Sequence, residues 1–384
     1  MTDYHATPPD ALRTLPTPLA LLDARRMQRN IDAMQARIDG LGVKLRPHVK
    51  TGKAIEIVRR LRAAGASGVT VSTLREAQAC FADGVTDILY AVGIAAVKLE
   101  RVRALREQGC ALKILCDNEA TARAIVEHGR AHRHRFEVWL EIDTDGHRAG
   151  LDPQGDALLA VARVLHEGGA TVGGVMTHAG ASYELHDDEA LRAIAETERA
   201  GCVRAAERLR ETGIACPNVS VGSTPTALSA GTLSGVTEVR AGVYVFQDLV
   251  MANVGVATFD DIALSVLTTV IGHQREKGWA LIDAGWMALS RDRGTQGQAH
   301  DYGYGQVCAL DGRPMHGYTV VAANQEHGII ARADAADADI ERHLPVGTTL
   351  RILPNHACAT AAQFDEYVVL DGDTLTRWPR FNGW

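Results

Sequence analysis

Between residues 43 and 245 the chain repeats one pattern of apolar and polar positions. A short run rich in β-branched residues is followed by a turn and then by a segment with apolar positions every three or four residues. Such runs are typical of buried strands, and such segments are typical of amphipathic helices that end at glycine. Eight runs predict strands, at residues 43–51, 68–74, 87–92, 111–117, 136–143, 171–179, 218–224 and 236–245.

Strands that alternate with helices pair in parallel. Eight such repeats over about 200 residues predict a (β/α)8 TIM-like barrel of the α/β class. An open doubly wound sheet is the alternative. It usually carries a G-x-G-x-x-G turn after its first strand, and no such turn follows the first run here.

After about residue 255 the pattern changes to β-rich runs that are joined by turns and leave little room for helices. These runs lie at residues 263–274, 278–285, 317–328 and 348–355. They predict a smaller antiparallel β domain, which a run at residues 18–23 would complete. The expected division is a barrel at residues 24–255 and a β domain made of residues 1–23 and 256–384.

Composition excludes several classes of protein. The 384 residues are 46% hydrophobic and 23% charged, with a net charge of −7, so we expect an ordinary core and no nucleic acid or anionic membrane as partner. The chain has no apolar run long enough for a transmembrane helix, and residues 1–9 lack the features of a secretory signal. Its seven scattered cysteines contain no C-x-x-C pair and predict a reducing compartment, the cytoplasm.

Three polar residues lie at or near predicted strand ends, where barrels of this kind carry their reacting groups. Lys50 ends the first strand and could form an imine with an aldehyde, although a solvated lysine is the commoner arrangement. His178 ends the sixth strand, where it either packs against a cofactor ring or is a core histidine bonded to a neighbour. Arg148, beyond the fifth strand, either donates to a phenolate oxygen or pairs with Asp143 or Asp145.

The last two predicted strands end in sequences that could hold a phosphate. VGSTPT supplies Gly222, Ser223 and Thr224, and RAGVYVF supplies Gly242 and Tyr244. Barrels often bind phosphate at these two strand ends through backbone N–H groups and small hydroxyl residues. A G-S-T turn is common by itself, but its combination with a lysine at the first strand outlines a cofactor with a phosphate at one end and an aldehyde at the other.

The motif PNHAC, residues 354–358, contains a second candidate site. In an extended chain residues i and i+2 face the same side, so His356 and Cys358 would present an imidazole and a thiol together. This soft pair suits zinc or a similar divalent ion with open positions for substrate, although an H-x-C motif alone is more often coincidence. The segment NQEHG, residues 324–328, is a candidate partner.

Seven motifs together carry a family resemblance: RPHVKT, DTDGHRAG, THAGASYE, VGSTPT, RAGVYVF, NQEHG and PNHACAT. From Thr17 to Trp384 the chain resembles the D-threonine aldolase and eukaryotic-type D-serine dehydratase family. The resemblance implies an alanine-racemase-like barrel followed by a β domain. It implies pyridoxal 5'-phosphate bound to Lys50 as a Schiff base, and a divalent metal (zinc, manganese, cobalt, nickel or magnesium) on His356 and Cys358.

The same resemblance assigns the remaining residues. Tyr183 approaches the pyridine nitrogen, Arg148 lies beside the phenolate, and the phosphate is lined by Gly222, Ser223, Thr224, Gly242 and Tyr244. Cys358 favours the dehydratases, because the aldolases of the family pair the metal histidine with a carboxylate.

The expected reaction is removal of water from a small-molecule substrate, a 3-hydroxy D-amino acid. The favoured substrate is D-threo-3-hydroxyaspartate, which would give oxaloacetate and ammonia. Aldol cleavage, D-serine dehydration and non-catalytic cofactor binding are the alternatives. The oligomeric state stays open, with a homodimer as one option.

Overall fold

A computed structural model of the chain describes residues 10–332 and 336–384. Residues 1–9, for which the sequence predicted no secretory signal, lie outside the described residues. The chain divides into two compact units: a barrel unit, made of residues 31–244 and 381–384, and a β unit, made of residues 1–30 and 245–380. The observed divisions fall after residues 30 and 244, whereas the pattern placed them after residues 23 and 255. Each unit is described by itself.

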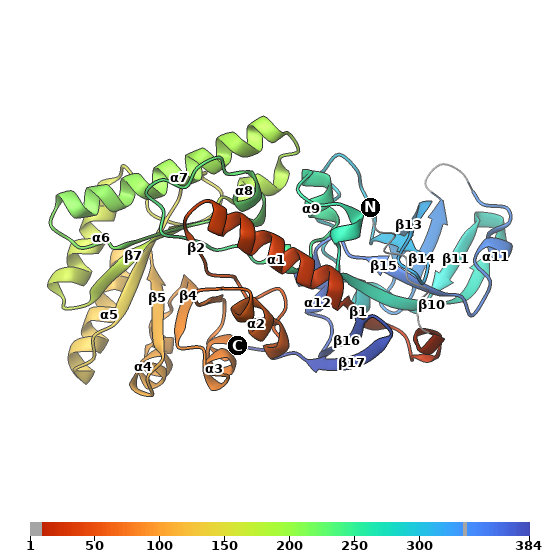
Figure 1. Ribbon diagram of the computed structural model, residues 1–384, viewed down its shortest axis with the longest axis horizontal. Coiled ribbons are helices and arrows are strands. Elements are labelled where there is room, and N and C mark those ends of the chain that lie inside the picture. Colours follow the sequence, from red (N-terminus) through yellow and green to blue (C-terminus); the bar gives the residue numbers. More distant parts are fainter. Residues whose placement is uncertain (1–9, 333–335) are drawn as a thin grey trace. The chain divides into compact units, whose positions relative to one another are not determined.

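Parallel strands form the sheet of the barrel unit (Figure 1). Their order within the described residues is β2-β9-β8-β7-β6-β5-β4-β3. Their bounds are β2 (Lys44–Leu45), β3 (Val69–Val71), β4 (Asp87–Gly93), β5 (Ala111–Cys116), β6 (Glu137–Ile142), β7 (Thr171–Thr177), β8 (Asn218–Val221) and β9 (Glu238–Val239). The sheet closes where His48 bridges Thr70 of β3 and the Val49 N–H donates to the Thr70 carbonyl. The prediction of a (β/α)8 barrel is confirmed.

The predicted strand at residues 43–51 is much shorter in the structure. Regular pairing is limited to Lys44–Leu45, because Pro47 has no N–H to donate and the chain turns at residues 49–52. Single hydrogen bonds continue the ladder beyond β2, from the Arg46 N–H to Val239 and from the His48 N–H to Ala241. Lys50 therefore lies in a turn just beyond the strand.

Helices cover the outside of these strands (Figure 1). They are α2 (Ile55–Ala63), α3 (Leu74–Ala82), α4 (Leu99–Glu107), α5 (Glu119–His132), α6 (Asp156–Glu167), α7 (Asp188–Glu211) and α8 (Thr224–Ser229), while α1 (Ala24–Gly40) crosses from one unit to the other. Helix α3 shows why they form: the Thr73 side chain accepts from the Glu76 N–H, and Leu74, Ala77 and Cys80 recur on the buried face. Short 3-10 helices complete the unit, η2 (Ala96–Lys98), η3 (Gly180–Glu184) and η4 (Val243–Val245), the last reaching the unit's boundary.

A layer of large side chains fills part of the barrel interior. Leu89, Leu115, Trp139 and Met176 come from four consecutive strands and form one buried cluster. Burial of each such side chain contributes roughly 1.5–3 kcal/mol to folding. The barrel is thus packed with side chains, as expected for the fold, and its strand ends are left to carry polar groups.

The β unit contains one sheet, which within the described residues has the order β11-β14-β13-β12-β15-β10-β1-β16-β17. The bounds are β1 (Leu19–Asp23), β10 (Leu264–Gln274), β11 (Trp279–Ile282), β12 (Gln306–Cys308), β13 (Pro314–Ala323), β14 (Gly328–Arg332), β15 (Thr349–Leu353), β16 (Glu366–Asp371) and β17 (Thr374–Pro379). The prediction of an antiparallel sheet is confirmed, with one exception: β1 pairs in parallel with β16.

Helices in the β unit are short. They are α9 (Leu249–Val254), α10 (Trp286–Leu289), α11 (Ile340–His343) and α12 (Ala357–Ala361), with the 3-10 helices η1 (Asp10–Thr14), η5 (Phe259–Asp261) and η6 (Arg275–Lys277). Val266, Val320 and Ile352 belong to the main apolar core of this unit. In neither unit does a described helix combine the length and apolar character that crossing a membrane would require.

Candidate active site

His178 connects several residues at the carboxyl ends of the barrel strands. It follows β7, and its Nδ1 donates to the Gly222 carbonyl over 3.3 Å. Its ring centroid lies 5.9 Å from that of Tyr183, with the ring planes inclined by 43°. Burial lowers the pKa of His178 to about 3, with a further contribution from the positive charges of Lys50 and Arg148. The structure thus gathers Lys50, Arg148, Tyr183 and Gly222 around a neutral imidazole.

Two lysines lie in the segment that follows β2, and their surroundings differ. Lys53 forms an ion pair of 3.1 Å with Glu76, a carboxylate that is fully buried. The Lys50 side chain is exposed, and among the described residues no carboxylate pairs with it. Its backbone N–H lies 3.4 Å from Nδ1 of His48. Lys53 is therefore engaged in packing, whereas the amine of Lys50 is available for chemistry.

Arg148 has a carboxylate partner that the sequence did not indicate. Its Nη2 lies 3.4 Å from Oε1 of Glu141. Asp143 instead accepts the backbone N–H groups of Asp145 and Gly146, at 3.2 and 2.7 Å. The alternative that Arg148 pairs with Asp143 or Asp145 is therefore wrong, because the first of these carboxylates is used to shape the turn and the second accepts other backbone N–H groups.

The strand ends that were predicted to hold a phosphate are joined to each other. The Thr224 hydroxyl accepts the Tyr244 N–H at 3.2 Å. Ser223 caps α8 by accepting from the Thr226 N–H. Gly222 adopts a φ of +123°, and a Cβ there would lie 3.1 Å from the backbone nitrogen of Arg240. Only glycine adopts this backbone conformation readily, so the turn after β8 is built around it.

Two further residues of the predicted phosphate site make close or unsatisfied contacts. A Cβ on Gly242 would lie 3.0 Å from the His48 carbonyl oxygen, so a larger side chain would crowd the backbone at His48. The Tyr244 hydroxyl is buried and, among the described residues, has no hydrogen-bond partner. Such an orphaned donor costs free energy unless a ligand satisfies it. A phosphate oxygen at this position would fit.

Glu198 is a residue of this site that the sequence analysis missed. It lies on α7, and its Oε1 accepts the N–H groups of Ala179 at 2.9 Å and Gly222 at 3.1 Å. Burial raises the pKa of this carboxyl. The residue ties the ends of β7 and β8 together. The available signal was an acid at helical spacing among the buried residues Leu191 and Cys202.

In the β unit, the metal pair lies at the start of a helix. His356 is extended and occupies the N-cap position of α12 without a side-chain capping hydrogen bond, and Cys358 is the second residue of that helix. The prediction that PNHAC is extended throughout is therefore wrong. Asp248 accepts the Ala357 N–H at 2.9 Å and so supports the beginning of the helix. The two side chains nevertheless meet, because a hydrogen bond joins Cys358 to His356.

The surroundings of His356 favour positive charge. Its Nδ1 lies 2.7 Å from Oδ2 of Asp292. Burial alone lowers the pKa of His356, but the charge of Cys358, the hydrogen bond with Asp292 and the charge of Asp248 outweigh it and raise that pKa to about 11. With Nδ1 held by Asp292, Nε2 remains as the ligand atom. An imidazole and a thiol beside two carboxylates fit a divalent cation.

The predicted partner segment NQEHG forms the turn between β13 and β14. There the Asn324 N–H donates to the His327 carbonyl over 2.7 Å. The acids that the structure places around His356 are Asp292 and Asp248, which no local motif marks. Asp292 is 64 residues away from His356 in the sequence.

Comparison with known proteins assigns the family. Residues 22–249 match the family described as alanine racemase, N-terminal domain, and residues 263–370 match a serine dehydratase domain. The chain is 61% identical to D-threo-3-hydroxyaspartate dehydratase of Delftia sp. (strain HT23), over 98% of this chain and 100% of that protein. A solved structure of that enzyme superposes with a TM-score of 0.96, covering 97% of this chain and 99% of the other.

Two further relatives agree with this assignment. The chain is 30% identical to a D-serine dehydratase of Dictyostelium discoideum over 95% of each protein. A solved alanine-racemase-like protein from Idiomarina loihiensis is 47% identical, with a TM-score of 0.94 over 98% of this chain and 100% of that one. The resemblance read from the motifs is confirmed. The chain belongs to the alanine racemase N-terminal domain family and, within it, to the group that contains D-threo-3-hydroxyaspartate dehydratase and the D-serine dehydratases.

Proposed function

We propose that this protein is a pyridoxal-phosphate- and divalent-metal-dependent lyase that removes water from a 3-hydroxy D-amino acid. The proposed substrate is D-threo-3-hydroxyaspartate, and the products are oxaloacetate and ammonia. The observation that carries the proposal is the grouping of Lys50, Arg148, Tyr183 and Gly222 around His178, in a chain 61% identical to a D-threo-3-hydroxyaspartate dehydratase.

The cofactor assignment uses the strand ends of the barrel. The family depends on pyridoxal phosphate. We assign its aldehyde to Lys50, its phenolate to Arg148 and its ring nitrogen to Tyr183. The phosphate would be held by the joined turns that contain Gly222, Ser223, Thr224, Gly242 and Tyr244. When bound, the cofactor supplies an electron sink for the charge that develops at the substrate Cα.

Lys50 is the proposed general base. Its exposed amine would take the proton from the substrate Cα. His178 would hold the cofactor ring by packing, and its orientation is set by the hydrogen bond from Nδ1 to Gly222. Because its pKa is lowered to about 3, this imidazole stays neutral and adds no positive charge beside the lysine that must accept a proton.

The metal assignment uses the start of α12. A solved structure of a D-threo-3-hydroxyaspartate dehydratase with a cysteine-to-alanine change is in the metal-free form, and another carries a histidine-to-alanine change two residues earlier. We assign the ligands to Nε2 of His356 and Sγ of Cys358, with Asp292 orienting the imidazole. When bound, a divalent cation supplies Lewis acidity for the departure of the 3-hydroxyl group.

The division of labour follows the two parts of the chain. We propose that the barrel unit binds the cofactor and that the β unit carries the metal site. The seven free cysteines suit a reducing compartment, and we assign the enzyme to the cytoplasm.

Product analysis tests this proposal. Protein loaded with pyridoxal phosphate and Zn²⁺ is incubated separately with D-threo-3-hydroxyaspartate, D-serine and D-threonine. We expect equal amounts of ammonia and oxaloacetate from the first substrate, and slower release of ammonia from the other two. Glycine and glyoxylate from 3-hydroxyaspartate would instead identify an aldolase and contradict the proposal.

A further inference from the structure

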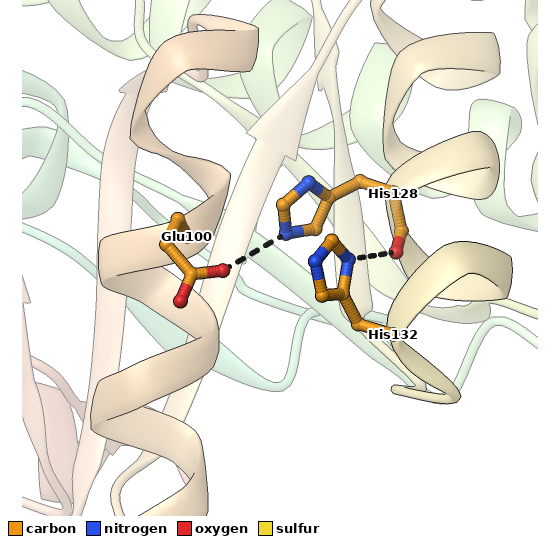
Figure 2. A group of neighbouring side chains, drawn as sticks. All are labelled: Glu100, His128 and His132. Carbon is orange, nitrogen blue, oxygen red and sulfur yellow. Dashed lines mark hydrogen bonds and ion pairs between the residues drawn. The ribbon is translucent and has the colours of Figure 1, made fainter.

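Helices α4 and α5 carry three metal-ligating side chains that the proposed reaction does not use. Glu100 comes from α4, and His128 and His132 come from α5. Figure 2 shows the three side chains gathered in the space between the two helices. One ligand atom from each, a carboxylate oxygen or an imidazole nitrogen, lies within 4.8 Å of the other two.

The two histidines are positioned by helical spacing. Residues i and i+4 lie on one face of a helix, and the two rings stack with centroids 4.2 Å apart. Nδ1 of His132 lies 2.9 Å from the His128 carbonyl. Because a carbonyl can only accept, Nδ1 must carry the proton, and Nε2 is left as the ligand atom. Backbone contacts of this kind commonly orient metal-binding histidines.

His128 provides the second observation. Its Nε2 is buried and makes no well-formed hydrogen bond among the described residues, and the contact with Glu100 that Figure 2 marks is an ion pair only when the ring is protonated. The nearest carboxylate oxygen, Oε2 of Glu100, lies 3.5 Å away, which is long for a hydrogen bond. Two ligands on a tetrahedral zinc ion with bonds of about 2.1 Å are separated by about 3.4 Å. The spacing between these two atoms therefore suits a shared metal ion better than a shared proton.

Arg103 holds Glu100 in place but leaves some lone pairs of the Glu100 carboxylate unused. The guanidinium donates from Nε to Oε2 over 2.9 Å and from Nη2 to Oε1 over 2.6 Å. These hydrogen bonds lower the pKa of Glu100 to about 2, so the carboxylate is ionised. A carboxylate has about four lone-pair sites, and two remain for a cation. Arg103 also binds Glu107 at 2.5 Å, which offsets its own positive charge.

We propose that Glu100, His128 and His132 form a second metal site, which binds a borderline divalent cation such as Zn²⁺ and clamps α4 to α5. Two imidazoles and one carboxylate are a ligand set that zinc accepts, with a water molecule as the fourth ligand. The site lies on the helical layer, on residues distinct from His356 and Cys358, and its occupancy does not depend on the proposed reaction.

Zinc binding to the full-length protein with its cofactor tests the inference. Chelator-treated protein is dialysed against Zn²⁺, and bound metal is measured by mass spectrometry. We expect the His132→Ala and Glu100→Gln proteins to bind one equivalent of zinc fewer than the unsubstituted protein at the same concentration of free Zn²⁺. Loss of an outer-shell partner already weakens metal binding about 10–100-fold, so loss of a ligand should weaken this site at least about 10-fold. The control His166→Ala removes an exposed histidine of α6 and should change nothing.

Anomalous diffraction at the zinc edge locates the ion independently. We expect a peak between Glu100 and the two histidines in crystals of the unchanged protein, and its loss in the Glu100→Gln protein. Glu100→Gln preserves size and helix propensity, which guards against a folding defect. Equal zinc content in the unchanged and His132→Ala proteins, or an anomalous peak only at other positions, would overturn the inference whatever the catalytic activity proves to be.

Discussion

The barrel unit and the β unit position their candidate functional residues in opposite ways. In the barrel, the residues come from the ends of separate strands and are joined by long-range hydrogen bonds, such as those from His178 to Gly222 and from the Ala179 and Gly222 N–H groups to Glu198. In the β unit, His356 and Cys358 are separated by one residue at the start of α12.

This difference predicts two kinds of failure. In the barrel unit, removal of a buried partner such as Glu198 should lower both the stability of the protein and its affinity for the cofactor. Replacement of His356 or Cys358, which lie together at the start of α12, should remove the metal and leave the fold intact. The following changes test this contrast, from the largest expected effect to the smallest.

Lys50→Met should abolish the reaction and leave the fold intact. General base catalysis is worth about 10²–10⁴-fold, and we expect at least about a 10³-fold loss of kcat for ammonia release. Because the Lys50 side chain is exposed, circular dichroism and the free energy of unfolding should be unchanged. Lys53→Met is the matched control: it breaks the ion pair to Glu76, so it should lower stability and retain catalysis. More than a tenth of normal activity in Lys50→Met would remove this lysine from the mechanism.

Glu198→Ala should lower both stability and cofactor retention. It leaves two buried backbone N–H groups, those of Ala179 and Gly222, without their acceptor. Each unsatisfied group costs about 1–3 kcal/mol, so the free energy of unfolding in urea should fall by about 2–6 kcal/mol. Glu198→Gln keeps an acceptor oxygen and should lose less than half as much. Equal losses in the two variants would show that these hydrogen bonds do not hold the strand ends.

Asp292→Ala should weaken metal binding without unfolding the β unit. The carboxylate contacts Nδ1 of His356, and removal of such a partner typically costs about 10–100-fold in metal affinity. Asp292→Asn, which can still accept from Nδ1, should lose less. Zinc affinity is measured by competition with a chelator, with Asp260→Ala as an exposed control. Unchanged affinity in Asp292→Ala would mean that His356 is not a ligand or is oriented by other groups.

Tyr244→Phe should affect only the cofactor-bound protein. The hydroxyl is buried without a partner among the described residues, so its removal should leave the stability of cofactor-free protein unchanged or slightly raised. A hydrogen bond to a charged phosphate is worth about 1.5–3 kcal/mol, and cofactor affinity should fall at least about 10-fold. Tyr318→Phe is the contrasting control, since that hydroxyl donates to Asp337 and its loss should lower stability alone. An unchanged cofactor affinity in Tyr244→Phe would place the phosphate elsewhere.

The sequence predicted the barrel because each of its repeats is local. A strand followed by a helix can be recognised within some 25 residues, and Lys50, His178 and Gly222 follow from the places where those strands end. Glu198 was recognisable in principle as an acid on the apolar face of α7. Asp292 was not, because it lies in an irregular segment far from His356 in sequence. The helix start at Ala357 was also missed, since it is supported by Asp248, the residue that caps α9.

The most direct test of the central claim separates the two units within a single variant. Cys358→Ala should lose its metal, keep its cofactor and still show a change in the visible absorption of the cofactor when D-threo-3-hydroxyaspartate is added, because the barrel residues are untouched. Formation of oxaloacetate should fall at least about 100-fold and should not recover with added Zn²⁺. Chelator-treated unchanged protein should show the same two results, but Zn²⁺ should restore its activity. Full turnover by rigorously metal-free protein would contradict the account and leave His356 and Cys358 as structural residues of α12.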